Sequence, residues 1–206
     1  MDKTTENKIG IMGGTFDPPH LGHLLSAEYT ASELELERVI FIPTGLKAYK
    51  SADNAASAAD RYAMTAAATA ANEKFDISDI EIRNTGINYT GDTLEKLHGI
   101  YPGTHFYFIV GADSLDYMDE WHEPEKLFRL CTVAAVGRPG FDKARIFDKA
   151  ELLKRRFNAD IRYIEMPQID ISSSEIKNRI KAGKSVRYMV PGCVEEYIKR
   201  EQLYFK

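Results

Sequence analysis

A glycine-rich turn near the N-terminus constrains the fold of this chain more than any other sequence feature. It follows the apolar run Ile9-Gly-Ile-Met12, which is typical of a buried strand, and it opens with Gly13 and Gly14. The segment Leu21–Leu34 is rich in helix formers and has no proline, so we expect a helix there. Such a turn points backbone N–H groups at open space, at the positive end of the helix dipole. The segment therefore predicts an α/β fold with a phosphate site at its first turn.

Two histidines, His20 and His23, stand at the start of the expected helix. Because they are about one helical turn apart, both rings can reach the same anion. The spacing matches neither the P-loop nor the GxGxxG pattern, so it indicates a different way of binding a nucleotide. A zinc site is the alternative, but the sequence offers no third ligand at a helical offset, and Gly22 weakens that interpretation.

Length and composition favour a single enzyme-like domain. A chain of 206 residues is long enough for one well-packed α/β domain, so we expect one domain over residues 1–206. The formal net charge is −4 and no Lys/Arg block stands out, which argues against a nucleic-acid partner. The polar N-terminus and the absence of any apolar stretch near about 20 residues predict no signal peptide and no membrane span. Cys131 and Cys193 form no CxxC, so we expect structural thiols and a cytoplasmic location.

Short apolar runs alternate with longer helical stretches along the chain. The expected strands are Lys8–Met12, Arg38–Ile42, Asp76–Ile80, His105–Val110, Thr132–Val136 and Ile161–Glu165. The expected helices are Leu21–Leu34, Ser57–Asn72, Asp92–Tyr101, Pro124–Leu130, Lys143–Phe157, Ser173–Ala182 and Cys193–Arg200. This order predicts a mainly parallel, doubly wound sheet with a helical C-terminal tail and a ligand-binding edge. The polar segment Lys47–Ala59 is either a surface loop or a lid over the substrate.

A second helix start follows the last expected strand, in the segment Ile171-Ser-Ser-Ser-Glu175. Its simple interpretation is a capping box, with Ser172 as N-cap and Glu175 as its partner. Parallel strands, however, open their following loops on one edge of the sheet. The hydroxyls, N–H groups and nearby cations of this segment can therefore form a second phosphate clamp that faces the histidine turn. The two clamps together suit a triphosphate.

Both segments resemble the HxGH nucleotidyltransferase superfamily. GGTFDPPHLGH at 13–23 and ISSSEIK at 171–177 are similar to its (H/T)xGH and ISSTxxR motifs. Within it, the chain resembles the bacterial nicotinate-nucleotide adenylyltransferases essentially end to end. Further matching segments are IPTG at 42–45, DRYAM at 60–64, NYTGDTL at 88–94, GADSL at 111–115, VGRPG at 136–140 and SVRYMVP at 185–191. NYTGDTL, GADSL and the tryptophan that follows point to the pyridine-nucleotide branch.

The resemblance implies a Rossmann-like fold and a step of NAD biosynthesis. In that step the AMP part of ATP is transferred to nicotinate mononucleotide, which gives nicotinate adenine dinucleotide and pyrophosphate. The mononucleotide phosphate is already an anionic nucleophile, so the protein needs positioned donors rather than a serine or cysteine nucleophile. Mg²⁺ is expected to travel with ATP, held largely by phosphate oxygens and water. The sequence does not indicate an oligomeric state.

The resemblance also assigns an ATP site. Its expected residues are Gly14, Thr15, Phe16, His20, His23, Gly111, Asp113, Ser173, Ser174 and Lys177. The two histidines would act on the ATP phosphates as the catalytic pair, and the two serines would hold the β/γ end. Asp113 would accept ribose hydroxyls; its alternative role is that of a turn aspartate. Lys177 stands where the family has arginine, so it keeps the positive charge but lacks the planar guanidinium fork. Arg179 is a poor replacement for that arginine, because it points elsewhere on an ideal helix.

A pyridine-mononucleotide site is implied as well. Its expected residues are Lys50, Thr90, Trp121, His122 and Arg138. The indole of Trp121 would stack on the pyridine ring, although a single tryptophan is more often a core residue. Thr90 and the backbone around His122 would meet the nicotinate carboxylate; the alternative is that Thr90 only caps a helix beginning near Asp92. The loop at Lys50 lacks the family's proline pair, so we expect it to be more flexible.

Other functions remain open at this point. The acceptor is alternatively nicotinamide mononucleotide or, more remotely, phosphopantetheine or a cytidylyltransferase substrate. Glu120 and Glu123 flank the expected ring platform, and a carboxylate pocket should lack nearby carboxylates. A non-catalytic nucleotide-binding regulator would be expected to lose the two histidines. A class I synthetase fragment would need a KMSKS-type loop, which the segment Lys184-Ser-Val-Arg187 is not.

Overall fold

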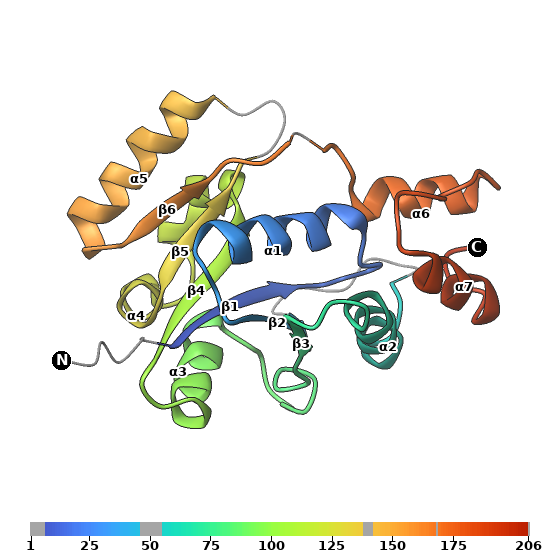
Figure 1. The fold of residues 1–206 in the computed structure, drawn as a ribbon, viewed down its shortest axis with the longest axis horizontal. Helices are drawn as coiled ribbons and strands as arrows, with labels where there is room; N and C mark the ends of the chain where they lie inside the picture. The colour runs from blue at the N-terminus through green and yellow to red at the C-terminus, as the bar shows by residue number, and fades with distance from the viewer. Residues whose placement is uncertain (1–6, 46–54, 138–141, 168, 206) are drawn as a thin grey trace. The chain divides into compact units, whose positions relative to one another are not determined.

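The computed structural model describes residues 7–45, 55–137, 142–167 and 169–205 (Figure 1). The strands of its sheet are β1 (Asn7–Gly14), β2 (Arg38–Pro43), β3 (Phe75–Ile77), β4 (Thr104–Gly111), β5 (Thr132–Val136) and β6 (Ile161–Ile164). Their order is β3-β2-β1-β4-β5-β6, and β4 is parallel to both β1 and β5, as β5 is to β6. This is the doubly wound order of Rossmann-type folds, which confirms the predicted fold class.

Every expected helix is present within two or three residues of its predicted ends. The helices are α1 (Leu21–Glu33), α2 (Ala58–Thr69), α3 (Thr90–Ile100), α4 (Pro124–Leu130), α5 (Lys143–Phe157), α6 (Ser173–Lys181) and α7 (Gly192–Arg200). The largest difference among the strands is at β3, which ends at Ile77 rather than Ile80. There the Ser78 hydroxyl accepts a hydrogen bond from the Ile80 N–H, and such local bonds compete with a strand ladder. None of the described helices is long and apolar enough to cross a membrane.

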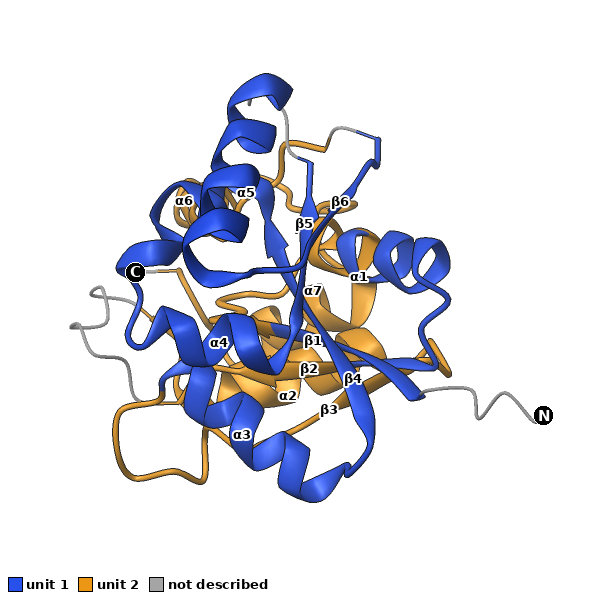
Figure 2. Ribbon diagram, turned by 90° about the vertical axis from the view of Figure 1, so that its left-hand side faces the viewer, with its two compact units in different colours: residues 1–12, 26–39, 89–168 blue, residues 13–25, 40–88, 169–206 orange. Residues whose placement is uncertain are grey.

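The chain forms two compact units (Figure 2). Unit 1 comprises residues 1–12, 26–39 and 89–168, and unit 2 comprises residues 13–25, 40–88 and 169–206. Strands β1 and β2 and helix α1 each contribute residues to both units. The single domain over residues 1–206 stays a prediction.

The interior of unit 1 is built on β4 and β5. All five residues of β5 are buried, because helices cover both faces of a parallel sheet. In the parallel pairing of β4 with β5, Phe108 lies opposite Val133. Gly10 of β1 has a packing reason to be glycine: an added Cβ would stand 2.9–3.1 Å from side-chain carbons of Leu36, Val39 and Ile109. The close approach of these apolar side chains therefore depends on the missing Cβ.

One element of unit 1 was not predicted, the 3-10 helix η1 (Ala112–Glu120). Its buried residues are Ala112, Leu115 and Met118, and this spacing of three is the period of a 3-10 helix. The segment was missed because its apolar residues follow neither the period of an α-helix nor that of a strand. η1 follows β4 directly and ends one residue before Trp121.

Unit 2 is held together by an apolar cluster between α2, α6 and α7. Ile176 and Ile180 form the apolar stripe of α6, and Val194 and Ile198 form that of α7, each pair one helical turn apart. Both pairs pack in one cluster with Met64 of α2. This cluster fixes the start of α6, where the second phosphate clamp was predicted.

Candidate active site

The turn after β1 is shaped around the ring of Phe16. Phe16 is 1% exposed and has a left-handed backbone (φ 50°), which is uncommon for a bulky residue. A Cβ on Gly14 would lie 3.1 Å from this ring, so the glycine lets the turn close over it. The Phe16 ring also makes an edge-to-face contact with the ring of His23, at 5.0 Å between ring centroids. The buried ring therefore supports one of the two histidines.

The two histidines stack on each other at the start of α1. Their ring centroids are 3.6 Å apart with an interplanar angle of 25°, and His20 is only 5% exposed. The backbone N–H of His20 donates to Nδ1 of His23 at 3.1 Å. Since Nδ1 is the acceptor in this bond, a neutral His23 carries its proton on Nε2. His23 is thus oriented as an Nε2–H donor.

Gly22 lies between the histidines for a steric reason. A Cβ at this position would stand 3.0 Å from Nδ1 of His20 and 3.2 Å from its Cε1. Any larger residue would therefore push the buried imidazole away from its partner. The glycine belongs to the histidine arrangement rather than to a general need for flexibility.

The start of α6 contacts the histidine turn within unit 2. Ser172 is the N-cap, and its hydroxyl accepts from the Glu175 N–H at 3.1 Å, as the capping prediction requires. The next hydroxyl, on Ser173, donates to the carbonyl of Pro18 at 2.9 Å, and the Asp17–Pro18 peptide bond is cis. Ser174 is exposed. The two segments predicted as phosphate clamps therefore lie next to each other.

Lys177 of α6 also meets this turn. Its ammonium donates to Oδ2 of Asp17 at 2.8 Å. Arg179 is engaged elsewhere, because its Nε donates to the Ser185 carbonyl at 2.9 Å. The lysine that replaces the family arginine therefore contacts the histidine turn, and its binding of the ATP phosphates stays a prediction.

Sequence reasoning missed Arg61, which joins two turns of unit 2. Arg61 is 6% exposed and donates to the carbonyls of Thr15 and Thr44, at 2.8 Å and 2.6 Å. Burial lowers the pKa of Arg61 from its ordinary value, and the nearby Asp17 carboxylate opposes that shift. The signal was present in the sequence: Arg61 shares the buried face of α2 with Met64, where a charged residue needs a specific partner.

In unit 1, the expected nucleotide residues follow β4. Gly111 ends β4 and is the cap position of η1, and Asp113 lies in the first turn of η1. Asp113 therefore stands at the carboxyl end of a central strand, as expected.

The expected ring-binding residues follow η1 in unit 1. The indole of Trp121 is half-buried and contacts the rings of Phe108 and Tyr117, at centroid distances of 6.2 Å and 6.5 Å. The His122 ring stacks on Tyr89 at 3.9 Å, and half of the His122 side chain is exposed. Trp121 is thus a partly open ring and not a core residue.

Thr90 is the first residue of α3, and the N-cap is Tyr89, which makes no side-chain capping bond. The alternative in which Thr90 caps a helix near Asp92 is therefore wrong. Of the two flanking carboxylates, Glu120 is exposed. Glu123, with a left-handed backbone, places Oε2 3.8 Å from Nε2 of His122.

Ion pairs fix η1 to α5. Asp119 accepts from Lys149 at 2.8 Å and from Arg156 at 3.3 Å, and Arg145 lies 2.8 Å from Asp116. The hydrogen bond from Lys149 lowers the pKa of Asp119 below its ordinary value. The segment that carries Asp113 and leads to Trp121 is therefore held to α5 by ion pairs.

Several expectations have other outcomes. Lys50, Arg138 and most of the Lys47–Ala59 segment lie outside the described residues. Within the described part of the chain, no group of three or more His, Cys, Asp or Glu residues could hold a metal ion.

The two cysteines differ in their surroundings. Burial raises the pKa of the Cys131 thiol to about 12, which makes it unreactive, whereas Cys193 is exposed.

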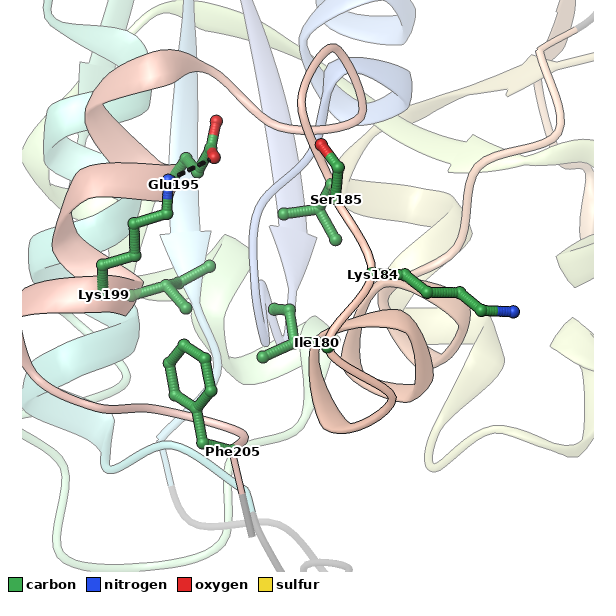
Figure 3. Close-up of a pocket in the computed structure, with 9 residues that line it drawn as sticks. Ile180, Lys184, Ser185, Glu195, Lys199 and Phe205 are labelled. Carbon is green, nitrogen blue, oxygen red and sulfur yellow. Dashed lines mark hydrogen bonds and ion pairs between the residues drawn. The ribbon is translucent and has the colours of Figure 1, made fainter.

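A cavity of about 360 Å³ in unit 2 lies apart from the predicted site residues. Ile180, Val186, Ile198 and Phe205 give it an apolar lining. Figure 3 shows the ion pair of Glu195 and Lys199 on one side of it and Lys184 pointing away from that pair. None of the expected site residues lines it.

Comparisons with known proteins agree on the family. The model of the cytidylyltransferase-like family matches residues 11–179. A relative from Desulfitobacterium hafniense (strain Y51) is 41% identical over 197 residues, covering 96% of this chain and 95% of the relative. One from Thermoanaerobacter sp. (strain X514) is 38% identical over 202 residues, covering 98% and 96%. Both are named "Probable nicotinate-nucleotide adenylyltransferase".

A solved structure shares the fold. It is that of the Plasmodium falciparum nicotinic acid mononucleotide adenylyltransferase complexed with NaAD, with a TM-score of 0.80 and 21% identity. The match covers 96% of this chain and 97% of that one. With close relatives along almost its whole length, the chain belongs to the cytidylyltransferase-like family and, within it, to the nicotinate-nucleotide adenylyltransferases.

Proposed function

We propose that this chain transfers AMP from ATP to nicotinate mononucleotide and releases nicotinate adenine dinucleotide and pyrophosphate. The observation that carries the proposal is the meeting, in unit 2, of the stacked histidines with the start of α6. The Ser173 hydroxyl bonds to Pro18, and Lys177 bonds to Asp17, so donors from both segments gather at one turn. The names of the relatives supply the acceptor.

The chemistry requires positioning and charge stabilisation. The phosphate oxygen of the mononucleotide attacks the α-phosphorus of ATP, and the bond from that phosphorus to the bridging oxygen breaks. Negative charge then grows on the departing pyrophosphate. His20 and His23, with the backbone of residues 14–16, would donate to the phosphate oxygens, and an oriented donor such as Nε2–H of His23 needs little reorganisation. No general base is required because the nucleophile is already ionised.

The remaining ATP residues have narrower roles in this proposal. Ser173, Ser174 and Lys177 would bind the β/γ end, and Asp113 would accept from the ribose hydroxyls. Mg²⁺ fits as a companion of ATP held mainly by phosphate oxygens and water, since the Asp17 carboxylate at this turn is already engaged by three donors. When bound, it would neutralise part of the phosphate charge.

For the acceptor, we propose that Trp121 stacks on the pyridine ring. Its indole is partly open, and the neighbouring Thr90 and His122 carry the polar groups. The backbone around His122 would donate to the nicotinate carboxylate. Lys50 and Arg138 are proposed to meet the mononucleotide phosphate, and the reaction is proposed to take place in the cytoplasm.

The test is pyrophosphate release from ATP and Mg²⁺ with nicotinate mononucleotide or nicotinamide mononucleotide in parallel. A higher kcat/KM for the acid is expected. Preference for the amide would keep the chemistry and change the acceptor. No release with either would contradict the proposal and return the chain to other acceptors or to a non-catalytic role.

A further inference from the structure

Tyr204, close to the C-terminus, reaches the histidine turn. Its hydroxyl donates to Oδ1 of Asp17 at 2.7 Å, across a sequence separation of 187 residues. Tyr204 is 7% exposed and packs in the same apolar cluster as α2, α6 and α7. The backbone is left-handed at both Gln202 and Tyr204, with φ of 53° and 70°. The end of the chain therefore adopts an uncommon backbone that places this hydroxyl on Asp17.

Asp17 is a buried carboxylate with three donors. Its Oδ1 accepts from the Tyr204 hydroxyl and from the Ala56 N–H, at 2.7 Å and 3.0 Å, and its Oδ2 accepts from Lys177 at 2.8 Å. The carboxylate is 4% exposed. The two bonds to Oδ1 hold the group in one orientation and leave Oδ2 for the lysine.

Lys177 needs such an anchor more than an arginine would. An ammonium on a flexible four-carbon stem has no fork to fix its direction, so its partners must fix it. One N–H of the Lys177 ammonium goes to Asp17, which leaves two further donors, and the Lys177 side chain is 26% exposed. Its Nζ also lies 6.0 Å from the centre of the Tyr204 ring, within reach of a cation–π contact. Tyr204 therefore acts on Lys177 through its hydroxyl, by way of Asp17, and through its ring.

We propose that Tyr204 is a positioning residue for ATP, which holds the Lys177 ammonium toward the phosphate tail through Asp17. This inference rests on the proposed function. Burial and the hydrogen bond to Asp17 raise the pKa of Tyr204 above its ordinary value, so the hydroxyl stays a donor throughout the working range. Tyr204 thereby becomes part of the ATP site, although it need not touch the nucleotide.

The test compares two tyrosine hydroxyls of unit 2. Tyr204→Phe removes the bond to Asp17 and keeps the ring; Tyr197→Phe removes a bond of the same kind, from the Tyr197 hydroxyl to Oδ1 of Asp60 at 3.0 Å. We expect Tyr204→Phe to raise KM for ATP about three- to tenfold, the loss typical of one hydrogen bond. The kcat and the KM for nicotinate mononucleotide should change less than about twofold in both variants. Thermal unfolding measures how much each substitution lowers the stability of the fold.

Two further variants test whether Tyr204 acts through Lys177. In a Lys177→Met background, Tyr204→Phe should raise KM for ATP little further, because the group that it positions is already gone. Replacing Tyr204 by 4-aminophenylalanine restores a donor at the same place and should recover KM. This replacement also serves as the second probe if Tyr204→Phe does not fold.

The outcomes separate this inference from the function on which it rests. The inference would be overturned if Tyr204→Phe left KM for ATP unchanged, or if Tyr204→Phe and Tyr197→Phe raised it equally. It would also be overturned if Tyr204→Phe raised KM for ATP by the same factor in the Lys177→Met background as in the unmodified chain. Calorimetry with MgATP alone gives Kd without an acceptor. A chain that binds ATP but transfers nothing to nicotinate mononucleotide would refute the proposed function, and its Kd values would still decide the role of Tyr204. A chain that binds no ATP would refute both.

Discussion

The phosphate-binding turn of unit 2 and the ring-binding segment of unit 1 are held in place by different means. In unit 2, Asp17, His20 and Arg61 are each at most 6% exposed, and the side chains of Asp17 and Arg61 are hydrogen-bonded to neighbouring segments. In unit 1, Trp121 and His122 are partly open, and η1 before them is fixed to α5 by ion pairs, one mostly buried (Asp119–Lys149) and one that reaches the surface (Asp116–Arg145). Buried polar networks are rigid and costly to disturb, whereas exposed ion pairs contribute little and are screened by salt. Mutations in unit 2 should therefore have the larger effects.

His20→Ala should produce the largest loss. Removing an oriented donor to the reacting phosphates is expected to lower kcat/KM about 10²- to 10³-fold, because its stabilisation is needed in the transition state. Steady-state pyrophosphate release measures this loss, with circular dichroism as the check on folding. His98→Gln, which alters a ring bonded to the Leu130 carbonyl in unit 1, is the matched control. Full turnover in a folded His20→Ala variant would remove the histidine from the mechanism.

Arg61→Met should lower the free energy of unfolding by about 2–4 kcal/mol, because two carbonyls lose a buried charged donor. Arg61→Lys keeps the charge but cannot place two N–H groups in a planar fork, so it should recover only part of this loss. Urea titration of the three proteins measures the difference. A change below about 0.5 kcal/mol in Arg61→Met, typical of a surface position, would mean that the two turns are held without Arg61.

Trp121→Ala should raise KM for nicotinate mononucleotide about tenfold and leave KM for ATP nearly unchanged, because a stacking surface for one substrate is lost. Trp121→Phe keeps an aromatic face, so its KM for nicotinate mononucleotide should lie between those of Trp121→Ala and the unmodified chain. Initial-rate kinetics with each substrate varied in turn separate the two KM values. An equal rise of both would indicate that Trp121 supports the structure rather than the pyridine ring.

Asp119→Asn should have the smallest effect, about a two- to threefold rise in KM for nicotinate mononucleotide. Salt should reduce this effect only in part, because the side chains of Lys149 and Asp119 are 18% and 14% exposed. The folded-state pKa of Asp119 lies below its usual value of 3.8. The stability contributed by this carboxylate is therefore fully present above that value and is lost as the pH falls through the lower, folded-state pKa. Thermal unfolding between pH 3 and pH 6 checks this: the difference between the two proteins should be constant above about pH 5 and shrink below it. A difference that grows toward acid pH would have the wrong sign.

Local patterns in the sequence were sufficient to predict most of the fold. The apolar runs and the helix formers gave every α-helix and strand, and Ser172 caps α6 as its spacing to Glu175 indicated. The glycine turn and the placement of the two histidines could likewise be predicted from the sequence, because their geometry is set by neighbours in the chain. η1 could not be predicted from these patterns, since its buried residues recur every three positions, which is the period of neither an α-helix nor a strand.

The anchoring of the site could not be predicted in the same way. The bond between Asp17 and Tyr204 joins residues at opposite ends of the chain, and no spacing rule relates them. Arg61 was partly readable as a charged residue on a buried helix face, but its two carbonyl partners were not. Contacts of this kind come from tertiary packing and need coordinates or a known relative.

The contact between Tyr204 and Asp17 also sets an order of events during synthesis. A domain generally folds as a unit, and the histidine turn is among the first segments to leave the ribosome. The Asp17 carboxylate can gain the hydroxyl donor only after residue 204 has left the ribosome. The nucleotide site of a nascent chain thus stays unfinished until Tyr204 is available, and a variant truncated before Tyr204 lacks the contact altogether.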